Sequence, residues 1–287
     1  IEKKLNVSLS SRGNLISILG NPKNIIITKN TLSKLYERAK LVNIIEEQDV
    51  EAIIKFMNDH DKNGKKQSNN YKNYFIKTPK GTIFPRSKGQ ENLIKQISEK
   101  QLVFAIGPAG TGKTFLAVSH AVSFLVSGMV DRIIISRPAV EAGEKLGFLP
   151  GDFKQKVDPY LKPIYDSLHE NLPNEKVLKL VNNEKIEIAP IAFMRGRTLN
   201  NAYVILDEAQ NTSAVQMKMF LTRLGNNSKM VVTGDLTQID LPSEQKSGLI
   251  DAERNLKNIN NISFVYLSEQ DVVRHALVSE IIKAYKK

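Results

Sequence analysis

The sequence predicts an α/β fold in which a parallel sheet is covered by helices on both faces, with a small α+β domain ahead of it. Three observations support this prediction. From residue 102 onward, short apolar runs alternate with amphipathic helical patterns, as buried parallel strands and their crossover helices do. A glycine-rich stretch at 107–114 separates one apolar run from a helical pattern. Residues 1–60 follow a different pattern of their own.

The small domain is expected over residues 1–60. NVSLSSRG and LISILG alternate apolar and polar residues, which favours two short strands. NTLSKLYERAKLV and EEQDVEAIIKFMND carry apolar residues at helical spacing. The stretch 61–74 is polar without periodicity, so we interpret it as a linker. The larger domain then covers 75–287.

The larger domain has six candidate strands. IKTPKGTIFPRSKGQ leads into a helix at ENLIKQISE, and SAVQMKMFLTRL is a later helical pattern. The strands are expected at LVFAI, RIIIS, IEIAP, AYVILD, KMVVTG and ISFVYL. Sheets of this kind bind phosphates at the carboxyl ends of their strands.

The composition is that of a soluble globular protein with an ample core. Hydrophobic residues make up 41% of the chain and charged residues 25%, and no apolar run approaches the ~20 residues that span a bilayer. No secretory leader is evident, although the chain starts at Ile1. The absence of cysteine excludes disulfides, thiolate metal sites and a cysteine nucleophile. These features fit a cytoplasmic protein without a membrane partner.

The positive charge is concentrated near the start of the chain. Of a net charge of +11, residues 1–86 carry +8, with 16 Lys and Arg against 8 Asp and Glu. A basic appendage on a near-neutral domain suggests a polyanionic partner, with nucleic acid as the first candidate. The alternative is an ordinary solvated face.

GPAGTGKT, residues 107–114, matches the P-loop pattern G-x-x-x-x-G-K-[ST] between a strand and a helix. Backbone N–H groups of such a loop wrap phosphates, and the helix N-terminus adds its positive dipole end. Lys113 is expected to reach the β- and γ-phosphates and Thr114 to offer its hydroxyl to Mg²⁺. The predicted nucleotide-binding set is Gly107, Pro108, Ala109, Gly110, Thr111, Gly112, Lys113 and Thr114.

AYVILDEAQ, residues 202–210, is an apolar strand that ends in two carboxylates. Asp207 is expected to hold Mg²⁺, and Glu208 is placed to polarise an attacking water. A carboxylate directly after the metal-binding Asp separates hydrolysing ATPases from many small kinases.

Two later segments supply further candidates. MVVTGDLTQIDLP ends a strand in polar residues, and Gln238, or Thr233 with Asp235, could sense the γ-phosphate. In DVVRHALV, Arg274 could stabilise charge on the transferring phosphoryl group, as an arginine finger does. His275 lacks companions at metal-binding spacing and is interpreted as structural.

Basic residues near two other strand ends could contact a partner. In SRPAVEAGEKLGFLPGD, Arg137 is the first candidate for a nucleic-acid backbone contact, followed by Lys145. FMRGRTL supplies Arg195 and Arg197, which could bind nucleic acid, carboxylates of a neighbouring subunit, or phosphate.

Gln90 precedes the first helix of the large domain. A glutamine at this position can hydrogen-bond the ring nitrogen and exocyclic amine of adenine. The chain also lacks an N-K-x-D guanine reader, so ATP is favoured over GTP.

The large domain resembles the PhoH family of bacterial P-loop ATPases. The resemblance covers about residues 75–287, and the basic N-terminal segment is similar to the small N-terminal domain of such proteins. That domain is compared with KH modules, but GNPK at 20–23 lacks the second glycine of a G-x-x-G clamp. The sequence blocks that carry the resemblance to the PhoH family, in family order, are IGPAGTGKT, RPAVEAGEKLGFLPGD, KVDPYLKPIYD, IEIAPIAFMRGRTLN, VILDEAQNT, QMKMFLTRLG, VVTGDLTQIDLP, SGL and DVVRH.

The resemblance implies an additional-strand P-loop NTPase fold, akin to one RecA-like motor domain of superfamily 1 helicases. It implies ATP binding and hydrolysis, a link to nucleic acid, a cytoplasmic location and an association with phosphate starvation. Some relatives carry a PIN nuclease domain, which the acids near residues 49–61 do not suggest here. The resemblance assigns catalytic or binding roles to Lys113, Thr114, Asp207, Glu208, Gln238 and Arg274.

Three functional classes follow. The first is an ATPase that acts on RNA or other single-stranded nucleic acid, the second a slow nucleotide-gated switch for a protein partner, and the third a small-molecule kinase. Glu208 disfavours the kinase. With one P-loop in the chain, Arg274 must act within its own domain or in trans, and the second arrangement predicts a homo-oligomeric ring such as a hexamer.

Overall fold

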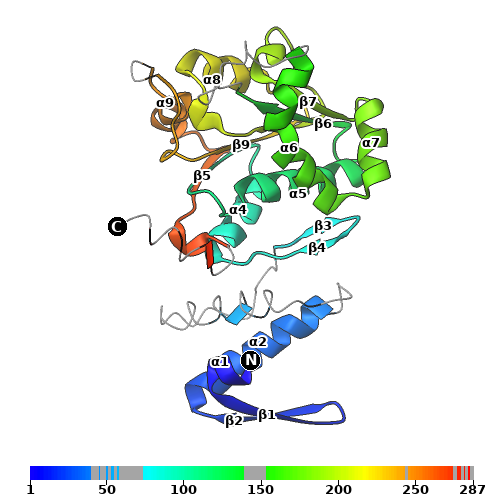
Figure 1. The fold of residues 1–287 in the computed structure, drawn as a ribbon, viewed down its shortest axis with the longest axis vertical. Helices are drawn as coiled ribbons and strands as arrows, with labels where there is room; N and C mark the ends of the chain where they lie inside the picture. The colour runs from blue at the N-terminus through cyan, green and yellow to red at the C-terminus, as the bar shows by residue number, and fades with distance from the viewer. Residues whose placement is uncertain are drawn as a thin grey trace. The chain divides into compact units, whose positions relative to one another are not determined.

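A computed structural model describes residues 1–39, 45, 50, 53–54, 57, 74–138, 153–242, 245–273, 277–278, 281 and 284 (Figure 1). The chain divides into two compact units. One consists of Ile1–Tyr74 with Phe84–Lys88, and the other of Phe75–Ile83 with Gly89–Lys287.

The first unit is a small α+β structure. Helix α1 (Glu2–Leu5) precedes two antiparallel strands, β1 (Val7–Arg12) and β2 (Leu15–Gly20), and helix α2 (Pro22–Ala39) follows. Its core gathers Leu5, Val7, Ile27 and Ile54. The two strands lie where the sequence predicts them. Helix α2 begins at Pro22, eight residues before the predicted start at Asn30, and α1 was not predicted. The second predicted helix falls largely outside the described residues.

The second unit is built on a six-stranded sheet whose neighbouring strands all run parallel. The strand order is β10-β5-β9-β8-β6-β7. Strand β9 therefore separates the strand before the glycine-rich loop from the strand that ends in the two carboxylates. This is the additional-strand arrangement that was expected. The strands are β5 (Leu102–Ile106), β6 (Arg132–Arg137), β7 (Ile186–Pro190), β8 (Ala202–Leu206), β9 (Lys229–Gly234) and β10 (Ile262–Tyr266).

Helices cover both faces of this sheet. On one face, alternate residues of the strands pack with Met217, Phe220, Leu249 and Ala252 of α8 and α9. On the other face, α5 contacts β6, β8 and β9, and α6 packs on α5. The helices are α4 (Lys88–Glu99), α5 (Lys113–Val126), α6 (Phe153–Asn171), α7 (Asn174–Asn182), α8 (Ala214–Leu221) and α9 (Gly248–Leu256), with 3-10 turns at Ile191–Met194 (η2), Ala209–Asn211 (η3) and Glu269–Asp271 (η4).

A short hairpin precedes α4 and was not predicted. Strands β3 (Ile76–Thr78) and β4 (Gly81–Ile83) pair antiparallel, and β3 contacts α5. Each strand has 3 residues, which is too short for an alternating pattern to be recognised in the sequence. Gly81, the first residue of β4, has φ 148°, a value open to glycine.

A buried polar cluster joins α4, α5 and the sheet. His120 lies 3.3 Å from the Ser98 hydroxyl and 3.2 Å from the Tyr203 hydroxyl, and it is 5% exposed. Burial, with Lys229 nearby, lowers the pKa of His120 to about 3. The Lys229 ammonium donates to backbone carbonyls of Ile97 and Lys100 at the end of α4. Through His120 in its neutral form, the cluster thus holds α5 against α4 and β8.

None of the described helices is both long and apolar enough to cross a membrane.

Candidate active site

The glycine-rich loop connects β5 to α5 and needs its glycines for steric reasons. A β-carbon at Gly107 would lie 2.5 Å from the backbone oxygen of Leu267, and one at Gly112 would lie 3.1 Å from the Gln90 amide nitrogen. Gly112 also has φ 82° and is the N-cap of α5. The loop therefore leads directly into a helix N-terminus, where unpaired N–H groups and the helix dipole favour a phosphate.

Lys113 folds back over this loop. Its ammonium donates to the backbone oxygens of Gly107 at 2.6 Å and Pro108 at 2.8 Å. The charge is thus held inside the curve of the loop, where phosphate oxygens would be bound.

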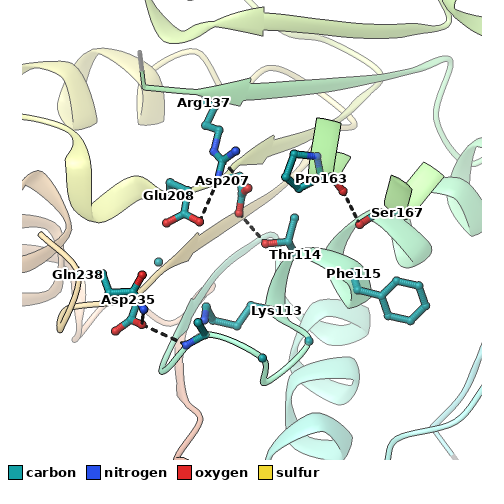
Figure 2. Close-up of a pocket in the computed structure, with 14 residues that line it drawn as sticks. Lys113, Thr114, Phe115, Arg137, Pro163, Ser167, Asp207, Glu208, Asp235 and Gln238 are labelled. Atoms are coloured by element: carbon teal, nitrogen blue, oxygen red, sulfur yellow. Dashed lines mark hydrogen bonds and ion pairs between the residues drawn. The ribbon is translucent and has the colours of Figure 1, made fainter. Parts of the chain in front are cut away.

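A pocket of about 280 Å³ opens beside the loop at the carboxyl edge of the sheet (Figure 2). The loop, the strand ends and α6 all contribute to its wall. Residues predicted to act on the nucleotide meet there, including Lys113, Thr114, Asp207, Glu208 and Gln238, and Arg137 joins them.

Asp207 connects the loop to two strands. One of its carboxylate oxygens accepts hydrogen bonds from the hydroxyls of Thr114 and Thr233, each at 2.6 Å, and the residue is 3% exposed. Oxygen donors of this kind suit a hard cation such as Mg²⁺. Among the described residues, no group of three or more His, Cys, Asp or Glu could hold a metal. An ion here would depend on Thr114, Asp207 and nucleotide oxygens, which is how Mg²⁺ is commonly bound.

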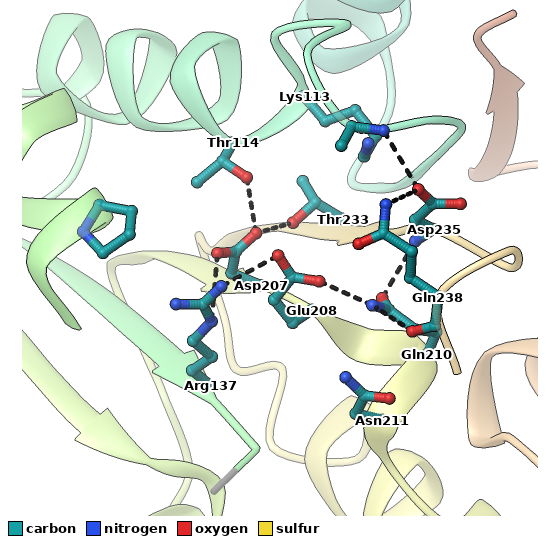
Figure 3. Close-up of polar contacts among 12 residues, drawn as sticks. Lys113, Thr114, Arg137, Asp207, Glu208, Gln210, Asn211, Thr233, Asp235 and Gln238 are labelled. Atoms are coloured by element: carbon teal, nitrogen blue, oxygen red, sulfur yellow. Dashed lines mark hydrogen bonds and ion pairs between the residues drawn. The ribbon is translucent and has the colours of Figure 1, made fainter. Parts of the chain in front are cut away.

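Glu208 follows Asp207 and turns into the same pocket (Figure 3). Its backbone has φ 53° and ψ 40°, the left-handed region. One carboxylate oxygen accepts from the Arg137 guanidinium at 2.9 Å and the other from the Gln210 amide at 2.6 Å.

The loop after β9 contacts the glycine-rich loop. Asp235 accepts a hydrogen bond from the Ala109 N–H at 3.1 Å and another from the Gln238 amide at 2.9 Å. The Gln210 side chain accepts from the Asp235 N–H at 3.0 Å and donates to the Gln238 backbone oxygen at 3.1 Å. Gln238 and Asp235, both predicted as phosphate sensors, therefore lie at the pocket, whereas Thr233 contacts Asp207.

Gln90 and Arg274 were predicted to act around the same loop. Gln90 is 5% exposed and its amide donates to the Thr111 backbone oxygen at 3.0 Å, which supports the loop. Its contact with adenine stays a prediction. The N–H of Val273 donates to the Gly110 oxygen at 3.0 Å. Arg274, like Lys145, lies outside the described residues.

The other candidate arginines lie in different surroundings. Arg137 lines the pocket and its guanidinium contacts the carboxylates of Asp207 and Glu208. Arg197 forms a two-pronged pair with Glu187, with distances of 2.6 and 2.7 Å, and Arg195 is exposed. The assignment of Arg137, Arg195 and Arg197 to nucleic acid stays a prediction.

Sequence reasoning missed two features of the site. Gln210 was not singled out, and Arg137 was not expected beside Glu208. The pairing of β6 with β8 explains the second, since Ser136 is opposite Leu206 and the next residues must also meet. A prediction of which strands are neighbours would have placed Arg137 next to Asp207.

The fold and this pocket define the chain as a P-loop nucleotide-binding protein, with the phosphate loop and the acidic strand end on either side of an inserted strand.

Comparisons with known proteins name a family. The profile described as "PhoH-like protein" matches residues 82–286. A PhoH-like protein of Bacillus subtilis (strain 168) is 49% identical over 288 residues, which is 100% of this chain and 90% of that protein. Protein PhoH of Escherichia coli (strain K12) is 47% identical over 205 residues, 71% of this chain and 58% of that protein. The chain belongs to the PhoH-like protein family, as the sequence motifs indicated.

Among solved structures, the Pif1 helicase of Candida albicans aligns with a TM-score of 0.38 and 15% identity, over 70% of this chain and 43% of that one.

Proposed function

We propose that this protein binds ATP with Mg²⁺, hydrolyses it, and couples hydrolysis to binding or remodelling of RNA or another single-stranded nucleic acid. The observation that carries the proposal is the 2.6 Å hydrogen bond between Thr114 and Asp207, with Glu208 as the next residue. The contact joins the phosphate loop to the metal-binding strand and leaves a second carboxylate beside it.

Each group has a distinct role in hydrolysis. Lys113 and the loop N–H groups bind the β- and γ-phosphates, and Thr114 and Asp207 hold Mg²⁺, which neutralises phosphate charge. Glu208 orients and polarises the attacking water, a contribution of roughly 10²–10⁴ in rate for a general base. Gln238, in the loop after β9, contacts the γ-phosphate and changes the position of that loop when the phosphate is lost. Gln90 hydrogen-bonds adenine and so favours ATP over GTP.

Charge supports the nucleic-acid part of the proposal. The net charge is +11, of which +8 lies in residues 1–86. Clustered Lys and Arg attract a phosphate backbone through release of its counterions.

A nucleotide-gated switch is the second candidate. A series of hydrogen bonds through Glu208, Gln210, Asp235 and Ala109 links the catalytic carboxylate to the phosphate loop, with the backbone N–H groups of Asp235 and Ala109 as two of the donors. Such a network can transmit the presence of a γ-phosphate to a surface that a protein partner recognises.

The test is steady-state ATP hydrolysis with and without single-stranded RNA, with Glu208→Gln as the blank. Turnover that RNA stimulates supports the proposal. Turnover that is indifferent to RNA favours the switch. Turnover by Glu208→Gln at the wild-type rate would refute the role given to Glu208.

We also propose a homo-oligomer, in ring form, if Arg274 acts in trans. Head-to-tail contacts close into a ring when the rotation between subunits allows it. A monomer mass by light scattering in the presence of ATP would exclude this arrangement.

A further inference from the structure

Arg137 is the last residue of β6 and its side chain enters the pocket (Figure 3). Its guanidinium lies 2.9 Å from a Glu208 oxygen and 3.7 Å from an Asp207 oxygen. The Arg137 side chain is 19% exposed and that of Glu208 38%, so the pair is partly shielded and is screened less than a fully exposed pair. One planar cation thus contacts the carboxylates of two residues that are adjacent in the chain.

Glu208 is held from both sides. Arg137 binds one carboxylate oxygen and the Gln210 amide binds the other at 2.6 Å. Gln210 is 1% exposed and is itself fixed by Asp235 and Gln238. Because both of its oxygens are bound and Gln210 is itself fixed, the Glu208 carboxylate has a defined direction rather than a choice of rotamers.

A defined direction matters because of the cation expected next door. Mg²⁺ bound at Thr114 and Asp207 would attract any carboxylate within reach as an additional ligand. A Glu208 that turned to the metal could not orient water at the γ-phosphate. The guanidinium and the amide oppose that turn, and the guanidinium also reduces the repulsion between the two adjacent carboxylates.

We propose that Arg137 is a positioning residue for ATP hydrolysis, which clamps Glu208 together with Gln210 in the direction needed to orient the attacking water. The inference rests on the proposed ATPase function. It assigns Arg137 to the hydrolytic site and makes the nucleic-acid role an outcome of the test.

The experiment compares Arg137→Met, which removes the charge, with Arg137→Lys, which keeps the charge but loses the planar fork. Basal turnover, the KM for ATP and the affinity for a non-hydrolysable ATP analogue are measured on the full chain. We expect Arg137→Met to lower kcat by roughly 10–100-fold, a fraction of what the whole base contributes, while KM and analogue affinity change less than about twofold. Arg137→Lys should be intermediate.

A double variant separates positioning from a general structural effect. In the Glu208→Gln background, Arg137→Met should cause no further loss in single-turnover rate, because a residue that acts through Glu208 has nothing left to position. Arg254→Met is the matched control, since Arg254 pairs with Asp251 on α9 and is 72% exposed. Its kcat should equal the wild-type value.

Several results would overturn the inference. These are a kcat for Arg137→Met at or above wild type, a loss that multiplies with that of Glu208→Gln, or a loss confined to analogue affinity. Reduced RNA affinity with unchanged basal turnover would return Arg137 to the nucleic-acid surface. If Arg137→Met unfolds, rescue of Arg137→Ala turnover by millimolar guanidinium replaces it, and no rescue counts against the inference.

The proposed function can fail separately. A wild-type protein without turnover, alone and with RNA, counts against the ATPase itself. An active wild type with an unaffected Arg137→Met counts against the clamp alone.

Discussion

Lys113 binds the backbone of the phosphate loop and is also the residue proposed to bind the nucleotide's phosphates. Its ammonium donates to two loop carbonyls, Gly107 and Pro108. These are neutral partners, and a charge-assisted bond to a phosphate is about twice as strong as a neutral one. The nucleotide should therefore draw Lys113 away from the carbonyls with a net gain in binding.

Replacement of this side chain gives a direct prediction. Lys113→Ala should raise the Kd for ATP by about tenfold or more, since every tenfold corresponds to about 1.4 kcal/mol, and should raise the Kd for ADP less. Calorimetric titration of both nucleotides measures this. Lys176→Ala, which removes an exposed lysine of α7, is the control and should bind as wild type does. Equal affinity in Lys113→Ala would mean that Lys113 only shapes the loop.

At the residue scale, the parts of the site that are contiguous in sequence could be predicted, and contacts between distant segments could not. Asp207 and Glu208 were predicted because they follow directly on an apolar strand, and Lys113 because its motif is contiguous. Gln210 and the pairing of Arg137 were not, because both depend on contacts between segments that lie far apart in the chain. Arg137 and Glu208 are 71 residues apart, and only the β6–β8 pairing brings them together.

At the scale of elements, strands that are buried throughout were predictable and short ones were not. Every residue of β5 and β8 is buried, so each reads as a continuous apolar run bounded by polar residues. The β3–β4 hairpin has too few residues for such a run and depends on the contact of β3 with α5. Tertiary packing, which the local sequence does not encode, decides elements of this length.

The α5 helix carries a buried titratable group with consequences for stability. His120 has a pKa of about 3 in the folded state against 6.5 for an unperturbed side chain, because burial disfavours the charged form. The unfolded chain therefore binds a proton that the folded chain does not, between these two values. Stability from this group is complete above pH 6.5 and is lost as the pH falls toward about 3.

We therefore expect His120→Gln to change the pH dependence of unfolding. The wild type should lose about 1.4 kcal/mol per pH unit from this group below its unfolded pKa, in addition to what its carboxylates cause. The variant keeps the carboxylates and lacks the histidine. Urea unfolding at neutral pH and at about pH 4.5 should show a loss smaller by roughly 2–3 kcal/mol in His120→Gln. Identical losses would indicate that His120 is protonated without cost in the folded state.

For the whole molecule, the uneven charge is the property that bears on partners. Residues 1–86 carry +8 of the net charge of +11, and lysines exposed in the first unit include Lys3, Lys4 and Lys29. If nucleic acid binds there, its affinity must fall with salt in proportion to the number of phosphates neutralised. If these lysines are only solvated, their removal should leave the salt dependence of nucleic-acid binding unchanged.

The corresponding experiment uses two triple variants with the same loss of charge. Lys3, Lys4 and Lys29→Gln remove three charges from the first unit, and Lys185, Lys218 and Lys257→Gln remove three exposed charges from the second. For single strands each phosphate contact contributes about 0.7 to the slope of log K against log salt. The first variant should flatten the slope for RNA by up to about 2, and the second should leave it close to wild type. Equal slopes in all three proteins would place the RNA contacts outside these lysines and return the charge of the first unit to solvent.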